Sequence, residues 1–327
     1  MKTIAVIVTY ADRFNLLKEV VTSCFSEGVK KIIIVDNNSH SNSKTSLKIL
    51  KEQYNDQIII QWNKSNLGSA KAYKQGLERA YGIENCDYIW LLDDDNKPRK
   101  QSLQILKDFW GDKKSEIACL LSYRPDRVQY KKAIQQRNPE LVLSKKNSFY
   151  GFHILDKISK IFTNKKTLVY DDQFGEISYA PYGGMFFHKS LLDIIGYPDE
   201  NFFLYSDDHD WSYRITDSGK KIFLVLNSII DDIDTSWGVT KNGKRTNVFL
   251  KIKDAPSLRV YYTLRNRMIF EKKYLVTNKL MYNLNVVLFT FFLFCFCLNN
   301  KNFKVFKQAI KDAKENNLNT KYEDLYN

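Results

Sequence analysis

The chain has 327 residues, of which 44% are hydrophobic, 14% aromatic and 27% charged; this composition supports a packed core and excludes global disorder. The formal net charge of +13 indicates an anionic partner, which composition alone leaves as nucleic acid, a lipid surface or a phosphorylated small molecule. The charge is uneven, because residues 1–237 carry 33 basic and 31 acidic side chains (net +2), whereas residues 238–327 carry 17 and 6 (net +11). We therefore expect a nearly neutral domain followed by a basic segment.

Apolar runs and helical spacings alternate through the first hundred residues. This alternation predicts an α/β fold with a Rossmann-like, mostly parallel central sheet flanked by helices, in which ligands bind beyond the C-terminal ends of the strands. The expected strands are 4–8, 32–35, 58–60 and 88–92, and the expected helices are 13–27, 43–54 and 67–81.

The middle of the chain has less regular patterns. Residues 124–175 are lysine-rich without sustained periodicity, so we expect a variable insertion or long loop region with some helix. A helix near 189–195, an acidic segment at 205–217 and a strand at 222–226 follow.

From about residue 255 the pattern is helical. The run 286–298 is apolar except for Thr290, but it is shorter than the roughly 20 residues that span a bilayer. Lysines crowd both of its sides, which favours a helix lying in or dipping into an anionic membrane face. The alternative is a buried helix packed on the domain.

The five cysteines are odd in number and include no CxxC pair, so neither a disulfide framework nor a zinc site is expected. A reducing compartment fits this usage better. Residues 3–8 are too short for the apolar core of a signal peptide and are expected to form the first strand.

Polar clusters follow the predicted strands. Asp93, Asp94 and Asp95 repel one another unless a cation lies among them, so they are candidates for Mg²⁺ or Mn²⁺, against the alternative of a solvated acidic turn. Asp36 can accept a hydrogen bond from a base or ribose, or can form an Asx-turn. Asn66 and Gly68 open a helix and favour an anion, or simply cap it.

A second acidic cluster, Asp207, Asp208 and Asp210, follows aromatic residues and opens a predicted helix. Acids in a first helical turn complement the helix dipole, which is the plainer explanation. Crowding beside an aromatic surface can also raise the pKa of one carboxylate into the range of a general base. We expect His209 to have a structural role.

Six segments in order carry a resemblance to a known family: IAVIVTYADR, IIIVDNNS, NLGSAKAYKQG, WLLDDDNKP, YGGMFFHK and FFLYSDDHDWSYRI. Together they resemble the family 2 nucleotide-sugar glycosyltransferases, which have the GT-A fold. The resemblance covers residues 1–237 and implies a GT-A catalytic domain there, with a nucleotide-sugar-binding half (1–100) and an acceptor-side half (101–237). Residues 238–327 would then form a helical, membrane-associating extension. The shorter segment 261–266 resembles bacterial rhamnosyl- and galactofuranosyltransferase-like members.

The resemblance implies a role for each matching position. Asp208 would be the catalytic base with Asp207 as its acidic neighbour, and Asp93 and Asp95 would hold the metal. Expected donor contacts are Thr9, Tyr10, Asp36, Asn66, Gly68, Asp93, Asp94 and Arg265. Expected acceptor-side residues are Gly183, Gly184, Tyr205, Asp210 and Trp211.

Two features depart from the family pattern. The glycine-rich helix start has fewer glycines, and no histidine follows His209, although a late histidine often ligates the metal in this family. Asp231, Asp232 or Asp234 could substitute as a ligand.

The expected function is inverting transfer of a sugar from a UDP- or dTDP-sugar, with Mg²⁺ or Mn²⁺, to a hydroxyl of a bacterial surface glycan such as O antigen or of a lipid-linked acceptor. We expect a cytoplasmic protein peripherally attached to the inner face of the plasma membrane, with no nucleic-acid partner. One alternative is a sugar nucleotidyltransferase, which normally has a glycine-rich and basic N-terminal loop that residues 9–13 do not supply. The other is a non-enzymatic basic membrane-binding protein.

Overall fold

The computed structural model describes residues 1–113, 117–162, 168–234, 247–297 and 300–323. The chain forms two compact units. The sheet unit comprises Met1–Val142, Val169–Glu200 and Asp208–Val239, and the helical unit comprises Leu143–Leu168, Asn201–Asp207 and Thr240–Asn327. The boundary expected at 237/238 falls in 235–246, outside the described residues. Two earlier segments, 143–168 and 201–207, group with the helical unit and not with the expected catalytic domain, because they pack on its helices.

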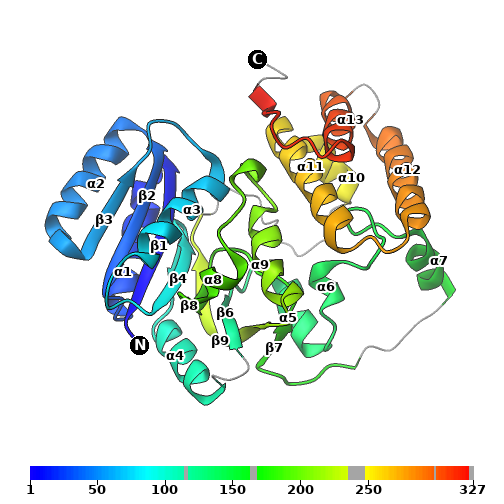
Figure 1. Ribbon diagram of the computed structural model, residues 1–327. Helices are drawn as coiled ribbons and strands as arrows, with labels where there is room; N and C mark the ends of the chain where they lie inside the picture. Colours follow the sequence, from blue (N-terminus) through cyan, green and yellow to red (C-terminus); the bar gives the residue numbers. More distant parts are fainter. Residues whose placement is uncertain (114–116, 163–167, 235–246, 298–299, 324–327) are drawn as a thin grey trace. The chain divides into compact units, whose positions relative to one another are not determined.

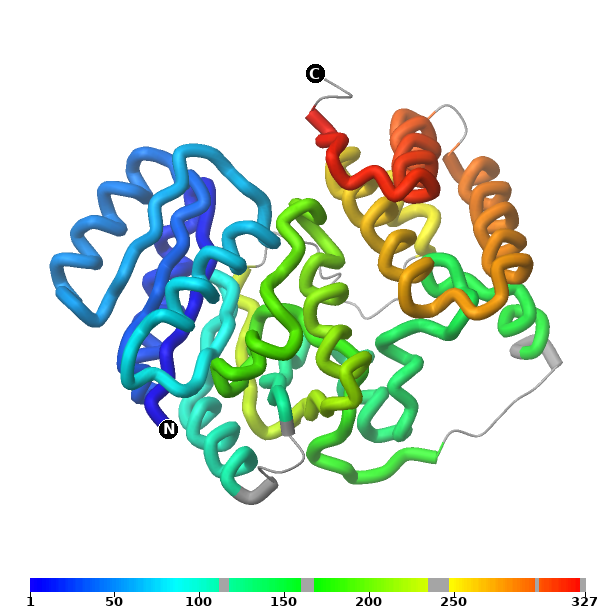
Figure 2. Tube along the Cα trace, in the orientation of Figure 1, coloured from blue at the N-terminus to red at the C-terminus, as the bar shows by residue number. Residues whose placement is uncertain are grey.

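The first 93 residues of the sheet unit alternate strand and helix as predicted, and their strands lie side by side (blue to cyan in Figure 2). The strand order β3-β2-β1-β4 is parallel throughout, so that Val6 of β1 pairs with Ile33 of β2 and Leu91 of β4. The elements are β1 (Thr3–Ala11), α1 (Phe14–Ser26), β2 (Lys31–Ser39), α2 (Ser41–Tyr54), β3 (Ile58–Trp62), α3 (Gly68–Tyr81) and β4 (Tyr88–Asp93).

The second half of the sheet is mixed, which differs from the expected mostly parallel sheet. Strand β8 lies antiparallel between β4 and β6, β6 and β9 are parallel, and β5 and β7 run antiparallel to β9, so four of the eight pairings are parallel. The elements are β5 (Asn96–Pro98), α4 (Ser102–Lys113), β6 (Ile117–Tyr123), α5 (Val128–Gln135), α6 (Glu140–Leu143), β7 (Phe174–Ile177), β8 (Met185–His188), α8 (Leu191–Ile195), α9 (Asp207–Asp217) and β9 (Lys221–Asp232).

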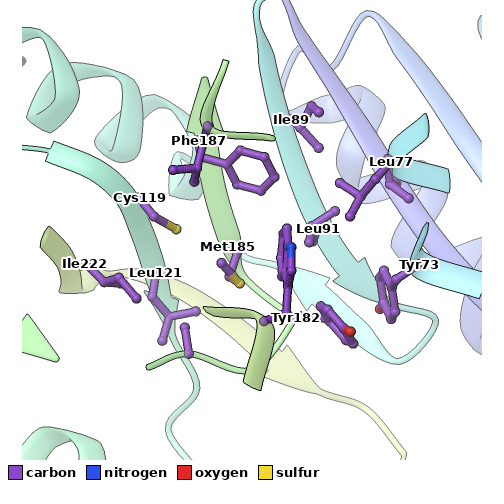
Figure 3. Close-up of a cluster of buried hydrophobic side chains, with 14 of the residues drawn as sticks. Tyr73, Leu77, Ile89, Leu91, Cys119, Leu121, Tyr182, Met185, Phe187 and Ile222 are labelled. Atoms are coloured by element: carbon purple, nitrogen blue, oxygen red, sulfur yellow. The ribbon is translucent and has the colours of Figure 1, made fainter. Parts of the chain in front are cut away.

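Helices cover both faces of this sheet, which explains why its central strands are apolar without alternation. On one face, Val6 and Ile33 belong to the same core as α3. Figure 3 shows Leu91 of this core beside Tyr73 and Leu77 of α3. The same core includes side chains of α5, α8 and α9. On the other face, Ala5, Ile7 and their neighbours pack against α1, α2 and α4 (Figure 1).

The helical unit is held together by a buried polar network as well as by apolar packing. Glu271 is fully buried and accepts hydrogen bonds from Arg267 (2.9 Å), Tyr282 (3.0 Å) and the amide of Tyr150 (3.0 Å). Burial raises the pKa of Glu271, and Arg267 opposes that effect. The helices are α7 (Ile154–Phe162), α10 (Val248–Asp254), α11 (Ser257–Tyr274), α12 (Lys279–Phe296) and α13 (Lys301–Lys314).

Helix α12 contains residues 286–296 of the apolar run noted in the sequence. By length and composition it is long enough to cross a membrane, and 28% of it is buried inside the structure. One of its faces packs on the rest of the helical unit, as the alternative of a buried helix predicted, and another face is exposed.

The close packing of α3 on the sheet gives a stability test. A Cβ at Gly76 would lie 2.4 Å from Cγ1 of Val6, so we expect Gly76→Ala to lower the free energy of unfolding by about 1–3 kcal/mol through overpacking. Gly111 in α4 has no atom within 4 Å of such a Cβ, so Gly111→Ala is the control and should stabilise by roughly 0.5–1 kcal/mol through helix propensity. Urea unfolding measures both; equal effects would contradict the packing described.

Candidate functional site

The ends of three neighbouring strands bring the predicted donor residues together. Thr9 of β1 pairs with Asp36 of β2, and Val8 of β1 pairs with Asp93 of β4. Thr9, Asp36 and Asp93 therefore lie at one edge of the sheet, where their strands run out. This is the edge at which open α/β sheets bind ligands.

Arg13, which precedes α1, contacts three carboxylates at this edge. Its guanidinium donates to Asp94 (2.9 Å), to Asp95 (2.7 Å) and to Asp234 (2.5 Å). Asp94 is buried and also accepts from the hydroxyl of Thr9 at 2.8 Å. Burial alone would lower the pKa of Arg13, but these carboxylates raise it above its usual range. Thr9, expected to contact the nucleoside, is used here to hold Asp94.

A second guanidinium, that of Arg124 after β6, forms ion pairs with other carboxylates of the cluster. Its side chain is 7% exposed and it pairs with Asp232, with Asp93 at 3.7 Å and with Asp126 at 3.6 Å. The sequence reasoning assigned no role to Arg13 and placed Arg124 at the start of a variable insertion. No local signal reveals either pairing, because the partners Asp234 and Asp232 lie more than 100 positions away.

The two guanidinium groups do not neutralise the cluster. Among the described residues, six carboxylates (Asp93, Asp94, Asp95, Asp126, Asp232 and Asp234) face these two cations, which leaves a formal charge of −4. Burial raises the pKa of Asp94 to about 6. Burial, with Asp93, Asp94 and Asp232 nearby, raises the pKa of Asp95 to about 7. The cluster is therefore short of positive charge.

The donor set fits a hard divalent cation chemically, since carboxylate oxygens are the ligands that Mg²⁺ and Mn²⁺ prefer. Among the described residues, however, no three acidic, histidine or cysteine side chains are arranged as a ready metal site. Arg13 faces Asp95 and Asp234, and Arg124 faces Asp232. Both oxygens of Asp95 accept hydrogen bonds, Oδ2 from Arg13 at 2.7 Å and Oδ1 from Asn96 at 2.8 Å, so a metal held by Asp93 and Asp95 would compete with these donors.

Asp36 has an unmet hydrogen-bonding requirement. It is fully buried, and its Oδ1 accepts from the amide of Ser39 at 3.0 Å, which is the Asx-turn considered above. Its Oδ2 is buried and has no hydrogen-bond partner among the described residues. A buried acceptor left unpaired costs about 1–3 kcal/mol, so this oxygen is available to a donor that the described residues do not supply.

Asparagines beside Asp36 shape the loop before α3. Asn66 accepts hydrogen bonds from the amide of Gly68 (2.9 Å) and from the side chain of Asn37 (2.9 Å), so the capping role considered for Asn66 is observed. Gly68 has φ +80°, a conformation that favours glycine. Tyr10 lies on the other side, with the guanidinium of Arg13 at 5.4 Å from its ring centre.

A chain of aromatic contacts joins Asp93 to helix α9. Tyr73 donates to Oδ1 of Asp93 at 2.6 Å, and its ring stacks on Tyr182 at 4.0 Å, as Figure 3 shows for the two rings. Tyr182 in turn lies 5.7 Å from Trp211 of α9. Tyr73 and Tyr182 lie in two of the segments that carry the family resemblance, but no role was predicted for either residue.

Gly183 belongs to the same neighbourhood. A Cβ there would lie 1.9 Å from Oδ1 of Asn96 and 2.7 Å from Oδ2 of Asp93. Any residue other than glycine would therefore clash with these two oxygens. Gly184 has φ +102° and donates its amide to the carbonyl of Leu91 at 2.8 Å. Both glycines, expected on the acceptor side, thus shape the edge around Asp93.

The three acids of α9 have different surroundings. Asp207 is buried, and Asp210 is buried and paired with Arg214 at 2.6 Å. The side chain of Asp208 is 21% exposed; its Oδ1 accepts from the amide of His209 at 2.8 Å. His209 packs on Tyr179 with ring centres 4.1 Å apart, in keeping with a structural role. Of the three acids, Asp208 is the one with surface to offer a substrate.

Two residues expected on the acceptor side are differently placed. Trp211 is fully buried and donates its indole N–H to the carbonyl of Gly196 at 2.8 Å, and Asp210 is occupied by Arg214. Both side chains therefore make contacts inside the protein that hold α9 in place, and neither faces a ligand. Tyr205 is half-buried, with Arg259 5.6 Å from its ring centre.

The segment before α9 is strained and is fastened by α11. Phe203, Tyr205 and Ser206 have φ between +58° and +64°, which costs about 1–3 kcal/mol for each non-glycine residue. Asn266 holds this segment by donating to the carbonyls of Phe202, Leu204 and Tyr205 at 2.8–2.9 Å.

The position of Arg265 differs from the one expected for a residue that contacts the diphosphate. It is fully buried in the helical unit and donates to the carbonyls of Thr320 (2.7 Å) and Phe202 (3.3 Å). The guanidinium has no surface left for a ligand, and its visible role is to hold the segment that leads into α9.

Comparison with known proteins agrees with this geometry. The family profile described as "Glycosyl transferase family 2" matches residues 5–177. None of the curated proteins matches the sequence significantly.

Among solved structures, the mannosyltransferase PcManGT from Pyrobaculum calidifontis in complex with GDP-Man and Mn²⁺ is 12% identical, with a TM-score of 0.53, over 96% of this chain and 75% of that one. GalNAc-T7 with UDP, GalNAc and Mn²⁺ is 13% identical, with a TM-score of 0.52, over 96% and 57%. S. aureus TarS is 11% identical, with a TM-score of 0.48, over 84% and 43%. This chain thus spans about half the length of the last two, and the likeness is one of fold.

The ion pairs of Arg13 give a second stability test. Arg13→Gln leaves buried Asp94 without its cation, and we expect a loss of about 3 kcal/mol or more in the free energy of unfolding. Arg99→Gln is the control, because Arg99 and Asp231 form an exposed pair worth about 0–1 kcal/mol. Urea unfolding measures the free energy of unfolding of both variants. Similar losses in the two would mean that Arg13 does not stabilise the strand-end cluster.

Proposed function

The chain belongs to glycosyl transferase family 2, and on that basis we propose that it transfers a sugar from a nucleoside diphosphate sugar to a hydroxyl group. The observation that carries this proposal is that a buried, unpaired acceptor and an excess of negative charge lie at the same edge of the sheet. Asp36 has a buried oxygen that lacks a hydrogen-bond donor, and the cluster around Asp93 lacks positive charge. A nucleoside with a metal-bound diphosphate supplies both.

The donor in this proposal is a uridine or thymidine diphosphate sugar. A carboxylate only accepts hydrogen bonds, and the N3–H of a pyrimidine base or a ribose hydroxyl is a matching donor for Oδ2 of Asp36. Tyr10, Asn66 and Gly68 line the neighbouring loops. The two structures of similar fold that contain GDP-Man or UDP support a nucleotide-bound donor as the class.

We assign a divalent metal, Mg²⁺ or Mn²⁺, to Asp93 and Asp95. When bound, such an ion would neutralise the charge of the departing diphosphate. The presence of Mn²⁺ in the two similar structures supports this assignment. Tyr73 and Gly183 position Asp93, the first through its hydrogen bond and the second by leaving space. Asp232 and Asp234 are further candidate ligands, since they pair with Arg124 and Arg13 in the same way that Asp95 pairs with Arg13.

Asp208 acts as the general base in this mechanism. It takes the proton of the acceptor hydroxyl while that oxygen forms a bond to the anomeric carbon and the bond from that carbon to the diphosphate oxygen breaks. Attack opposite the leaving group inverts the anomeric configuration. Holding both substrates in line contributes much of the rate, and buried Asp210 and Trp211 keep α9 in place for this purpose.

The proposed acceptor is a bacterial surface glycan such as O antigen, or a lipid-linked precursor, and the proposed location is the cytoplasmic face of the plasma membrane. The net charge of +11 on residues 238–327 supports attachment to an anionic leaflet. The five cysteines are free, which suits a reducing compartment.

Replacing Asp36 tests the donor site. Asp36→Asn keeps the oxygen that accepts from Ser39 but turns an N–H group toward the ligand, so we expect affinity for UDP or dTDP to fall about 10- to 100-fold. Isothermal titration with Mn²⁺ present measures this, with exposed Asp56→Asn as control. No binding of any nucleoside diphosphate by the unmodified protein, or equal binding by Asp36→Asn, would contradict the assignment.

Replacing Asp208 tests the base. Asp208→Asn should lower kcat for sugar transfer about 10²- to 10⁴-fold, because the amide cannot accept the proton. Donor affinity should stay unchanged, and Asp217→Asn, an exposed position in the same helix, should keep full activity. Near-normal transfer by Asp208→Asn would remove the residue from the mechanism.

A further inference from the structure

Helix α12 presents two apolar stripes on opposite sides. Residues three and four positions apart share a face of a helix, and both stripes follow that spacing. The first stripe is buried against the helical unit: Tyr282, Asn285, Val286, Phe289 and Leu293. The second is exposed over 45–84% of each side chain: Leu280, Leu284, Val287, Phe291 and Phe294.

The exposed stripe continues into a groove between α12 and α13. The groove has a volume of about 760 Å³. Its floor combines Phe291 and Phe294 of α12 with Phe303, Phe306 and Ile310 of α13. Its charged border consists of three lysines and one acid, with a net charge of +2: Lys307, Lys311, Lys314 and Glu315. All three lysines are exposed. An apolar channel with a cationic border matches a lipid that has a hydrocarbon chain and an anionic headgroup.

The buried stripe keeps α12 attached to its unit. Asn285 is fully buried; it donates to the carbonyl of Asn147 at 2.8 Å and accepts from the amide of Ile154 at 2.9 Å. Tyr282 donates to buried Glu271. A helix that crossed a bilayer alone would give up these bonds and leave Glu271 short of a donor, so α12 suits a position along a membrane surface better than across it.

We propose that the α12–α13 groove is a binding site for an anionic phospholipid, through which the helical unit rests on one leaflet of the membrane. The acyl chain lies on the exposed stripe, and the phosphate meets Lys307, Lys311 and Lys314. A second copy of the chain is disfavoured as the occupant, because it would bring two lysine borders together. This inference rests on the membrane attachment proposed above and adds the site and the mode of insertion.

Vesicle co-sedimentation tests the apolar part. The intact protein should bind vesicles of phosphatidylcholine with phosphatidylglycerol at least tenfold better than vesicles of phosphatidylcholine alone. Phe291→Ser removes a large apolar contact and should weaken binding about 10- to 100-fold. Ile49→Ser, at an equally exposed apolar position of α2, is the control and should bind like the intact protein.

The lysines are tested together. Replacement of Lys307, Lys311 and Lys314 by glutamine should weaken binding to the anionic vesicles about a hundredfold, without affecting the weak binding to neutral ones. The control replaces Lys30, Lys48 and Lys51 by glutamine, which removes the same charge from exposed positions of the sheet unit.

Several results would overturn the proposal. Unchanged vesicle binding by Phe291→Ser or by the α13 lysine variant would remove the groove, and retention on vesicles after carbonate extraction would mean that the helix spans the bilayer. A lipid-free dimer that Phe291→Ser converts to a monomer would identify a second copy as the occupant. UDP affinity, measured on the same samples, separates the two proposals: a failure of nucleotide binding in all of them would refute the proposed function and leave the lipid site untouched.

Discussion

The site depends on electrostatic repulsion among carboxylates that the fold gathers at one edge of the sheet. Asp93 ends β4, Asp94 and Asp95 follow it, and β9 adds Asp232 with Asp234 just after it. Buried like charges of this number are tolerated only with cations among them. Arg13 and Arg124 provide two, and burial together with the neighbouring carboxylates still raises the pKa of Asp94 and Asp95. The metal proposed above would be attracted by the same excess of negative charge, and the diphosphate would bind through that metal.

The rest of the structure arranges groups around that cluster. Tyr73, Tyr182 and Trp211 form a stacked path from Asp93 to α9, so the donor edge and the helix bearing the proposed base share one aromatic core. Asn266 holds the carbonyls of the segment before α9, which offsets the left-handed backbone there. The basic residues of the C-terminal segment lie in two environments: Arg265 is buried and bonded inside the helical unit, while the lysines of α13 are exposed.

Much of this could be predicted from the sequence where the signal is local. Apolar runs gave the parallel strands of the first 93 residues, and polar residues after them marked Asp36 and Asp93. The antiparallel direction of β8 could not be predicted, since the short apolar run Met185–His188 contains no signal that distinguishes a parallel from an antiparallel strand. Arg13 and Arg124 were missed because their partners are distant in sequence. Arg265 was misplaced because the family resemblance assigned it to the diphosphate, whereas packing of α11 buries it.

The central claim is that the carboxylates at the sheet edge bind a metal together with a nucleoside diphosphate. Electron paramagnetic resonance of Mn²⁺ tests it directly, by counting bound ions with and without UDP or dTDP. The account predicts one tightly bound Mn²⁺ that requires the nucleotide, because Arg13 otherwise holds Asp95, and predicts its loss when Asp93 and Asp95 are both replaced by asparagine. Nucleotide-dependent Mn²⁺ binding that persists in that double variant would contradict it.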